Sequence, residues 1–474
     1  MERMIWKRLL SPKRVKGLDG EPSSVKLAED PRSEFERDFG RSVFSTPVRR
    51  LQDKAQVFPL EQHDAIRTRL THSLEVSSVS RSLGVAAEKV AAEKKEIEGD
   101  LLGAIPTIAA TCGLIHDLGN PPFGHAGEQA ICDWFAKRER FETGFFDDFA
   151  QSGGKKKARN TQFARDFLNF DGNAQTQRLL SRLQVLADDY GLNMTCATLS
   201  GSCKYVATSN ATDPSNQATK KHGYFASEND LIAKIRAEVG TDASRNPIAF
   251  LVEASDDIVY STVDLEDGIK KGCLRWHFLE EELQKRAKSD CLTRILAESH
   301  KKIDPARFKG PMLDEAMAVA FRTFAIAEMV VATRRVFETN YESIMNGECP
   351  HELLYQSEAG GLASACKKIG LEYVYVSPEI LKLEVMGRKI ISDLLDLYWE
   401  AAKEMAGANK MSRFQAKIYS LISSNYRRIF ENNLTKASQL GIPSKYFGMQ
   451  LITDQISGMT DSFAVTLHRE LTNG

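Results

Sequence analysis

The chain has 474 residues, and its 63 Lys and Arg against 64 Asp and Glu give a net charge of −1. Balanced charge of this kind does not draw a whole chain onto nucleic acid or anionic lipid. The composition, 42% hydrophobic and 27% charged, is that of an ordinary globular protein and excludes a wholly disordered or collagen-like chain. The 8 Cys are scattered without a C-x-x-C pair, which is too sparse for a disulfide scaffold and typical of a reducing cytosol.

Targeting and membrane segments are not expected. Residues 1–16 are basic but contain no apolar stretch of the kind that a secretory signal needs. The longest nearly uncharged segment, residues 101–115, is shorter than the ~20 residues of a membrane-spanning helix. We therefore expect a cytoplasmic protein that does not bind a membrane.

Apolar side chains recur at helical spacing through most of the chain. In residues 71–92 they stand three to four positions apart, which is the pattern of an amphipathic helix. The same pattern predicts helices over residues 101–116, 124–138, 174–190, 247–271, 277–297, 313–338, 378–405, 411–432 and 449–471. Strand-like alternation is confined to residues 372–376, with a weaker candidate over 203–207. These patterns predict an all-α fold with a few short strands in insertions.

Three segments rich in Gly, Pro, Ser or Asn interrupt the helical pattern, over residues 151–161, 208–222 and 347–361. Because candidate functional residues lie on both sides of two of them, we interpret these segments as insertions and not as domain boundaries. Length alone would allow about three domains of ~150 residues. We expect instead one large domain over residues 1–474, with its core over roughly 45–272 and a C-terminal helical region over 273–474.

His116 and Asp117 close an apolar segment just before Pro121 and Pro122, where a helix must end. An imidazole and a carboxylate at a buried helix end cannot both stay unpaired without a large desolvation cost, and a bound cation would offset it. A metal that activates water uses neutral imidazoles and carboxylates and leaves positions open for water and substrate. His72, His116, Asp117 and one later carboxylate could supply that set.

The later carboxylate comes from Asp256 and Asp257, which interrupt an apolar helical pattern. An ordinary solvated helix face is an equally good interpretation of this pair alone. Asp256, Tyr260 and Asp264 stand four residues apart and so share one helix face.

His125 and Glu128 stand three residues apart on another predicted helix. A carboxylate one turn away can hold an imidazole in one tautomer and raise its basicity, as a general acid or base requires. A purely structural pair on the helix face is the alternative.

Seven segments in this order resemble the HD superfamily of metal-dependent phosphohydrolases, and within it the deoxyguanosine triphosphate triphosphohydrolase family. They are residues 49–59, 67–76, 116–128, 172–175, 204–205, 253–260 and 456–461.

The resemblance implies an HD-type helical fold in which the C-terminal region completes the pocket and contributes oligomer contacts. It also implies roles for residues in four groups. The metal ligands would be His72, His116, Asp117 and Asp256, and the catalytic dyad His125 and Glu128. The deoxyribose would be contacted by Gln56, Tyr260 and Asp264, and the phosphates by Arg69, Asn120, Asn173, Lys204 and Lys221. Asp256 is implied over Asp257 because the family's metal Asp precedes its substrate Tyr by four residues.

The activity that the resemblance implies is metal-dependent hydrolysis of a deoxynucleoside triphosphate, dGTP first, to deoxynucleoside and inorganic triphosphate. The cofactor would be Mg²⁺ or Mn²⁺, with other transition metals possible, and family members are homo-oligomers, commonly hexamers. Regulation by a nucleotide or single-stranded DNA stays open, as does whether His125 acts on the water or on the leaving group. The alternatives are an HD phosphohydrolase for another nucleotide and a non-catalytic nucleotide or single-stranded DNA binding protein. The near-zero net charge weighs against nucleic-acid binding.

Overall fold

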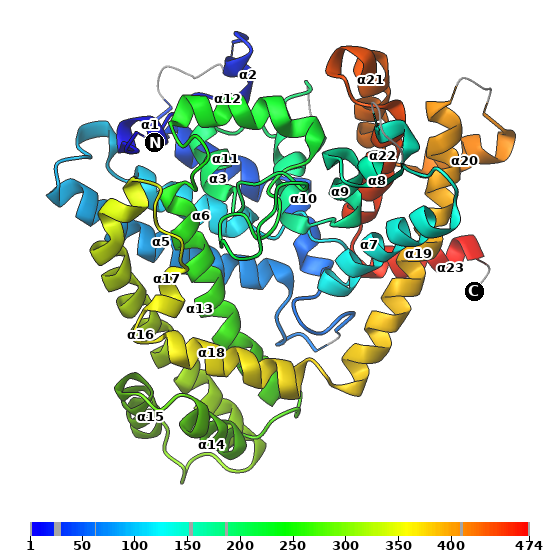
Figure 1. Cartoon of the computed structure of the whole chain (residues 1–474). Coiled ribbons are helices and arrows are strands. Elements are labelled where there is room, and N and C mark those ends of the chain that lie inside the picture. The colour runs from blue at the N-terminus through cyan, green and yellow to red at the C-terminus, as the bar shows by residue number, and fades with distance from the viewer. Residues whose placement is uncertain are drawn as a thin grey trace.

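The computed structural model is built from helices that lie at many angles to one another (Figure 1). It describes residues 2–22, 30–61, 63–150, 155–184, 188–407 and 411–472. Within those ranges no strand is formed, and extended backbone pairs only in three isolated bridges, Arg14–Thr195, Ala55–Thr68 and Ala207–His222. The all-α prediction is therefore confirmed, whereas the short strands expected in insertions do not occur in the described residues.

Fifteen of the helices in these ranges are longer than seven residues. They are α3 (Glu34–Val43), α5 (Arg69–Glu93), α6 (Ala104–Ile115), α7 (Gly124–Phe141), α12 (Asn229–Val239), α13 (Pro247–Lys270), α14 (Trp276–Arg286), α15 (Asp290–Lys302), α16 (Pro311–Met345), α18 (Gly360–Ile369), α19 (Pro378–Ala406), α20 (Arg413–Leu421), α21 (Ser424–Leu440), α22 (Ser444–Ser457) and α23 (Asp461–Thr472). The shorter ones are α1 (Trp6–Leu9), α2 (Val15–Leu18), α4 (Thr46–Arg50), α8 (Lys155–Arg159), α9 (Gln162–Leu168), α10 (Gly172–Arg178), α11 (Cys196–Ser202) and α17 (Leu353–Gln356). Single turns form η1 (Leu51–Asp53), η2 (Gly99–Leu101), η3 (Asp147–Phe149), η4 (Leu179–Leu183), η5 (Ala226–Glu228) and η6 (Gly370–Val374).

Six predicted helices are confirmed as single elements, namely α5, α6, α7, α13, α16 and α19. Three others are each two helices: α14 and α15, α20 and α21, and α22 and α23. Ser289 begins α15 because its side chain accepts a hydrogen bond from the Leu292 N–H, at 3.2 Å, which satisfies a donor of the new helix. The helix predicted over 174–190 ends in η4, and residues 185–187 lie outside the described ranges.

The strand predicted over 372–376 is wrong, because η6 continues α18 as a π-helical turn there. Val374 is fully buried and packs on Gly268 of α13, where a Cβ atom would lie 2.7 Å from Val374 Cγ2. Packing on a helix thus takes the place of pairing with a second strand. The weaker candidate over 203–207 contributes only the bridge between Ala207 and His222.

The predicted insertions are irregular with two exceptions. Residues 208–222 contain no helix, as expected. The segment over 151–161 includes α8, and the one over 347–361 includes α17 and the start of α18. Residues 151–154 lie outside the described ranges.

Helices α5, α6 and α13 pack on one another in the middle of the molecule and carry most of the candidate site (Figure 1). Gly84 of α5 permits the close approach to α6, since a Cβ atom there would lie 2.7 Å from the Pro106 Cα. The Ser77 hydroxyl donates to the Ala110 carbonyl across the same contact, at 2.7 Å. A tightly joined helix pair provides a rigid base for residues at its ends.

Helix α16 is long and apolar enough to cross a membrane, by length and composition alone. It packs against α5, α13 and α15, and its Arg322 forms an ion pair with Glu266 of α13 at 2.5 Å. Met329 and Ala332 are buried, whereas Val331 is exposed. One face of α16 is thus part of the core, and the opposite face is accessible.

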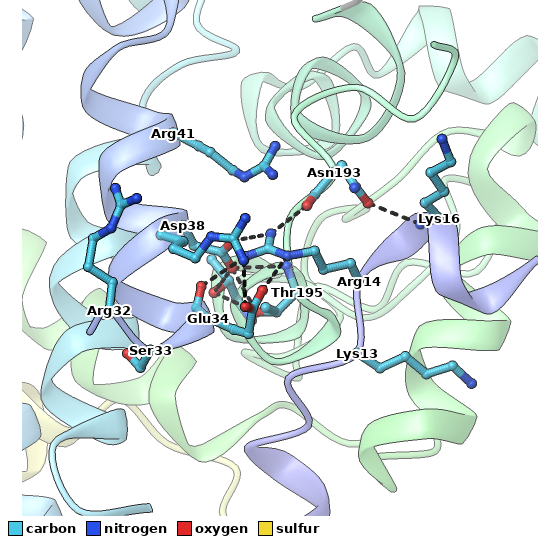
Figure 2. A network of polar contacts seen from close by, with 12 residues as sticks. Lys13, Arg14, Lys16, Arg32, Ser33, Glu34, Asp38, Arg41, Asn193 and Thr195 are labelled. Carbon is cyan, nitrogen blue, oxygen red and sulfur yellow. Dashed lines mark hydrogen bonds and ion pairs between the residues drawn. The ribbon is translucent and has the colours of Figure 1, made fainter. Parts of the chain in front are cut away.

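A buried ion pair joins the N-terminal segment to α3 and to the start of α11 (Figure 2). Arg14 donates to Asp38 at 2.7 Å and to Glu34 at 2.6 Å. The second oxygen of Asp38 accepts the Thr195 N–H at 2.9 Å and the Thr198 hydroxyl at 2.8 Å. Because both oxygens of the Asp38 carboxylate have partners, the charge can stay buried, and none of these partners is a predicted site residue.

Candidate active site

Three of the four predicted metal ligands converge on one point. His72 comes from the first turns of α5, His116 from the end of α6 and Asp256 from the middle of α13. One ligand atom from each lies within 4.8 Å of the other two. Asp256 Oδ1 is 3.2 Å from His72 Nε2 and 3.6 Å from His116 Nε2. Residues 184 positions apart thus form one polar group inside the helical core.

The electrostatics of this group fit a cation. Burial opposes protonation of His116, but the carboxylates of Asp117 and Asp256 outweigh it and raise the pKa of His116 to about 9. Burial also opposes ionisation of Asp256, yet His116 beside it holds the pKa of that carboxyl well below its usual range. His116 Nε2, which lies 3.6 Å from Asp256 Oδ1, is buried without a hydrogen-bond partner. Two imidazoles and a carboxylate that meet at one point form a donor set for a divalent metal ion.

Asp117 lies beside this group, with its Oδ1 3.6 Å from His116 Nε2. Arg69 donates to Asp117 Oδ2 at 2.5 Å, and the Asn120 amide donates to Oδ1 at 2.7 Å. Despite burial, His116 and Arg69 lower the pKa of Asp117. His116 is fixed in turn by its Nδ1, which lies 2.7 Å from the Gly113 carbonyl oxygen. Contacts of this kind orient ligands and tune the metal that they bind.

The predicted His125–Glu128 pair forms in the first turn of α7. His125 Nδ1 lies 2.9 Å from Glu128 Oε2, and Glu128 Oε1 accepts the Gly172 N–H at 2.7 Å. The His125 side chain is 88% exposed, whereas that of Glu128 is 12% exposed. The hydrogen bond that Glu128 accepts from the ring raises the pKa of His125. An accessible imidazole held by a buried carboxylate is suited to moving protons to and from a ligand.

The backbone that leads into α7 is unusual, because Phe123 and Gly124 both have positive φ, of 63° and 58°. A side chain at Gly124 would also be strained by contact, since its Cβ would lie 2.7 Å from Arg69 Nη2. The approach of Arg69 to this turn brings the guanidinium group beside both Asp117 and the start of the His125 helix.

The residues predicted to contact phosphates are paired with carboxylates of the protein. Lys221 donates to Asp171 Oδ2 at 2.6 Å, and the Asn173 amide donates to Asp171 Oδ1 at 2.8 Å. Lys204 Nζ lies 3.8 Å from Glu253 Oε1. Burial opposes the charges of both lysines, but Tyr205 and Glu253 raise the pKa of Lys204, and Asp171 raises that of Lys221. The two ammonium groups therefore stay charged, and an anionic ligand could share them.

The residues predicted to contact the sugar retain polar atoms without partners. Gln56 Oε1 and Asp264 Oδ1 are buried and accept no hydrogen bond from the described residues. The hydroxyls of Tyr260 and Tyr355 are also buried without a hydrogen-bond partner in the described residues. Burial raises the pKa of Asp264 to about 7. Buried polar atoms without partners cost ~1–3 kcal/mol each, so a polar ligand that satisfies them gains affinity.

Sequence reasoning missed three side chains at this end of the site. The Tyr375 hydroxyl donates to Asp264 Oδ2 across 111 positions of the chain. The Lys367 ammonium lies 5.5 Å from the ring centre of Tyr260 and 6.0 Å from that of Tyr355. Tyr375 lies in the segment wrongly predicted as a strand, and its alternating pattern gave no indication of this contact.

Proteins of known name are similar to the chain over nearly its whole length, although no protein-family model matches it. A deoxyguanosinetriphosphate triphosphohydrolase-like protein of Listeria innocua is 34% identical over 484 aligned residues, which cover 99% of both chains. The protein of the same name in Listeria monocytogenes has the same identity and coverage. A deoxyguanosinetriphosphate triphosphohydrolase of Klebsiella pneumoniae is 30% identical over 95% of this chain and 96% of its own.

The helical fold, its partly buried histidine–aspartate group and these relatives define a class: the protein is an enzyme that hydrolyses deoxynucleoside triphosphates. Within that class, the chain belongs to the deoxyguanosine triphosphate triphosphohydrolase family, because the identity reaches 30–34% across almost all of both chains. The resemblance found in the sequence is thereby confirmed. The individual roles of the site residues, and the extent of the domain over 1–474, stay predictions.

Proposed function

We propose that the chain hydrolyses dGTP at the α-phosphorus to give deoxyguanosine and inorganic triphosphate, with the help of a divalent metal ion. The observation that carries this proposal is the convergence of His72, His116 and Asp256 on one partly buried point. The unpartnered oxygens of Gln56 and Asp264 support a polar, sugar-like ligand near it. The printed names of the relatives support dGTP as the first substrate to test.

The metal would be held by His72, His116 and Asp256, with Asp117 as the fourth ligand. Imidazole favours transition metals, and carboxylate suits both Mg²⁺ and Mn²⁺, so we place Mn²⁺ before Mg²⁺ and keep other transition metals open. When bound, such an ion makes water more acidic and offsets phosphate charge.

The protein's own groups would then divide the remaining work. A triphosphate carries about four negative charges, which must be offset before water can reach the α-phosphorus. Arg69, Lys204 and Lys221 are the cations for this task, and Asn120 and Asn173 would donate hydrogen bonds to phosphate oxygens. Gln56 and Asp264 would bind the 3′-hydroxyl, and the Tyr260 ring would exclude a ribose 2′-hydroxyl. His125 would transfer a proton, either from the attacking water or to the departing 5′-oxygen.

The products test the proposal directly. Purified protein with Mn²⁺ and each deoxynucleoside triphosphate in turn should release deoxynucleoside and intact triphosphate, fastest from dGTP, as measured by anion-exchange chromatography. GTP serves as the matched control and should react more slowly, because the Tyr260 ring opposes its 2′-hydroxyl. Release of orthophosphate and a diphosphate would contradict attack at the α-phosphorus. Binding of dGTP without any product would favour a non-catalytic nucleotide-binding protein.

The pH profile should reveal the role of His125. Replacing Glu128 with Gln removes the hydrogen bond that raises the pKa of His125, while the amide oxygen can still accept the Gly172 N–H. The pKa of His125 should therefore fall. If imidazolium is the active form, the alkaline limb of kcat/KM moves to lower pH; if neutral imidazole is active, the acidic limb does. A profile in which neither limb moves would contradict a role for His125 in proton transfer.

Assembly and location extend the proposal. We infer a homo-oligomer because large apolar side chains such as Phe44, Met312 and Val331 are exposed. A hexamer is the first form to test, because the family resemblance implies it. A cytoplasmic location is supported by the eight cysteines of the described residues, all of which are free thiols.

A further inference from the structure

A buried lysine lies behind the candidate site. Lys54 is only 4% exposed, and its ammonium group donates to the carbonyl oxygens of Asn120 at 2.5 Å and Ser457 at 2.8 Å. In the part of the chain that the structure describes, it forms no ion pair with a carboxylate. Burial lowers the pKa of Lys54 to about 7. Burying an ammonium group without a close carboxylate costs free energy of folding. Stability is therefore not the reason for a lysine at this position.

Asp461, the first residue of α23, is a second buried charged residue in the same region as Lys54. It is 2% exposed, and its two oxygens accept two backbone N–H groups, from Phe123 at 2.9 Å and from Ala55 at 3.0 Å. Phe123 is the residue with positive φ that directly precedes α7. Asp461 therefore fixes the entry into the helix that carries His125.

Lys54 and Asp461 bind the same three segments. The first is residues 54–55, next to Gln56, where the Lys54 carbonyl also accepts the N–H of Arg69 at 3.0 Å. The second is the loop after Asp117, which is held through the Asn120 carbonyl and the Phe123 N–H. The third is the junction of α22 and α23. All three segments meet only in the folded chain, since residues 54 and 457 are 403 positions apart.

Lys54 is connected to the candidate metal group through one intermediate residue, Asn120. The Asn120 amide donates to Asp117 Oδ1 at 2.7 Å, while the Asn120 carbonyl accepts from Lys54. Neither Lys54 nor Asp461 forms a hydrogen bond or ion pair with His72, His116 or Asp256, as far as the described residues show. Both therefore act on the site through backbone that they hold.

We propose that Lys54 and Asp461 are positioning residues. They would hold the loop over 117–124 in place, and with it keep Asp117 and His125 correctly positioned relative to the metal group. Through these two residues, the C-terminal helices α22 and α23 would support the active-site loop. The inference rests on the function proposed above. Replacing a residue that orients metal ligands without binding the metal itself typically lowers metal affinity or activity by about 10–100-fold.

The test uses Lys54→Met and Asp461→Asn in the full chain. Each should lower kcat by about 10–100-fold and weaken Mn²⁺ binding by a similar factor, as measured by initial rates and by titration calorimetry. KM for dGTP should change less than kcat, because Lys204, Lys221 and Tyr260 come from other segments and would still bind the substrate, although Gln56, Arg69 and Asn120 lie in or beside the segments that are disturbed. Asp461→Asn keeps the size of the side chain and one acceptor oxygen, so it carries the test if Lys54→Met does not fold.

Asp38→Asn is the matched control. Asp38 is also a buried carboxylate that accepts a backbone N–H, that of Thr195, but in the network of Figure 2. This variant should lower the melting temperature and leave kcat per folded molecule and Mn²⁺ affinity as in the wild type. The double variant Lys54→Met/Asp461→Asn should be little worse than the poorer single one, because both residues hold the same loop.

The proposal is overturned if Lys54→Met and Asp461→Asn behave like the control, with a lower melting temperature but unchanged kcat and Mn²⁺ affinity. Failure of the proposed function gives a different result, namely no triphosphate from the wild type. The Mn²⁺ titration would still decide whether Lys54 and Asp461 position the metal group.

Discussion

Replacing Asp256 with Asn is expected to lower turnover of dGTP by at least ~10³-fold and to weaken Mn²⁺ binding strongly. Asp256 supplies the carboxylate between His72 and His116, with its Oδ1 3.2 Å and 3.6 Å from their Nε2 atoms. A metal contributes several kcal/mol to such a reaction, and each ~1.4 kcal/mol lost is a factor of ten in rate. Asn keeps the shape of the side chain but not its charge, so the helix should fold normally. Initial rates, calorimetric titration with Mn²⁺ and a far-UV spectrum measure the three effects.

The adjacent Asp257 provides the control for this variant. Burial raises the pKa of Asp257 to about 8, so its carboxyl is mostly protonated at neutral pH and resembles the amide of Asn. Asp257→Asn should therefore leave Mn²⁺ affinity close to that of the wild type. If Asp257→Asn removes Mn²⁺ binding and Asp256→Asn does not, the assignment of the ligand has to be exchanged.

The fold could be predicted from the sequence wherever the pattern of neighbouring residues alone determines the secondary structure. Helices α5, α6 and α13 follow from apolar periodicity, and each was predicted within a few residues of its ends. The break between α14 and α15 was missed because the apolar pattern continues past Ser289, whose side chain caps the start of a new helix. The π-helical turn η6 was missed because Val374 is placed by Gly268 of a distant helix, which no window of neighbouring residues contains.

The candidate site shows the same division. The spacing of Asp256, Tyr260 and Asp264, and of His125 and Glu128, lies within one helix and was predicted from the sequence. The meeting of His72 with Asp256 joins residues 184 positions apart. The chemistry of metal ligands indicated this set from the sequence, but only the resemblance to a family chose Asp256 over Asp257. Lys54 and Asp461 stood in the segments that carried the resemblance, but their contacts depend on how α22 and α23 return to the loop after Asp117.

Replacing His125 with Asn is expected to lower kcat by about 10²–10⁴-fold while Mn²⁺ binding is retained. His125 contacts Glu128 and no member of the metal group in the described residues, and its exposed imidazole can reach a bound ligand. Asn cannot exchange a proton near neutral pH, but it can still accept or donate one hydrogen bond. The loss should therefore appear in the proton-transfer step and not in the affinity for metal or substrate.

His300 offers a matched pair away from the site for this experiment, because its Nε2 lies 2.9 Å from Glu280 Oε1 and its side chain is 53% exposed. His300→Asn should leave kcat, KM and Mn²⁺ affinity unchanged, which shows that loss of a His–Glu contact is not harmful in itself. Single-turnover rates at saturating Mn²⁺ would then assign the loss in His125→Asn to the chemical step. Wild-type single-turnover rates in His125→Asn would mean that the protons move without this imidazole, and the dyad would have to be assigned to other groups.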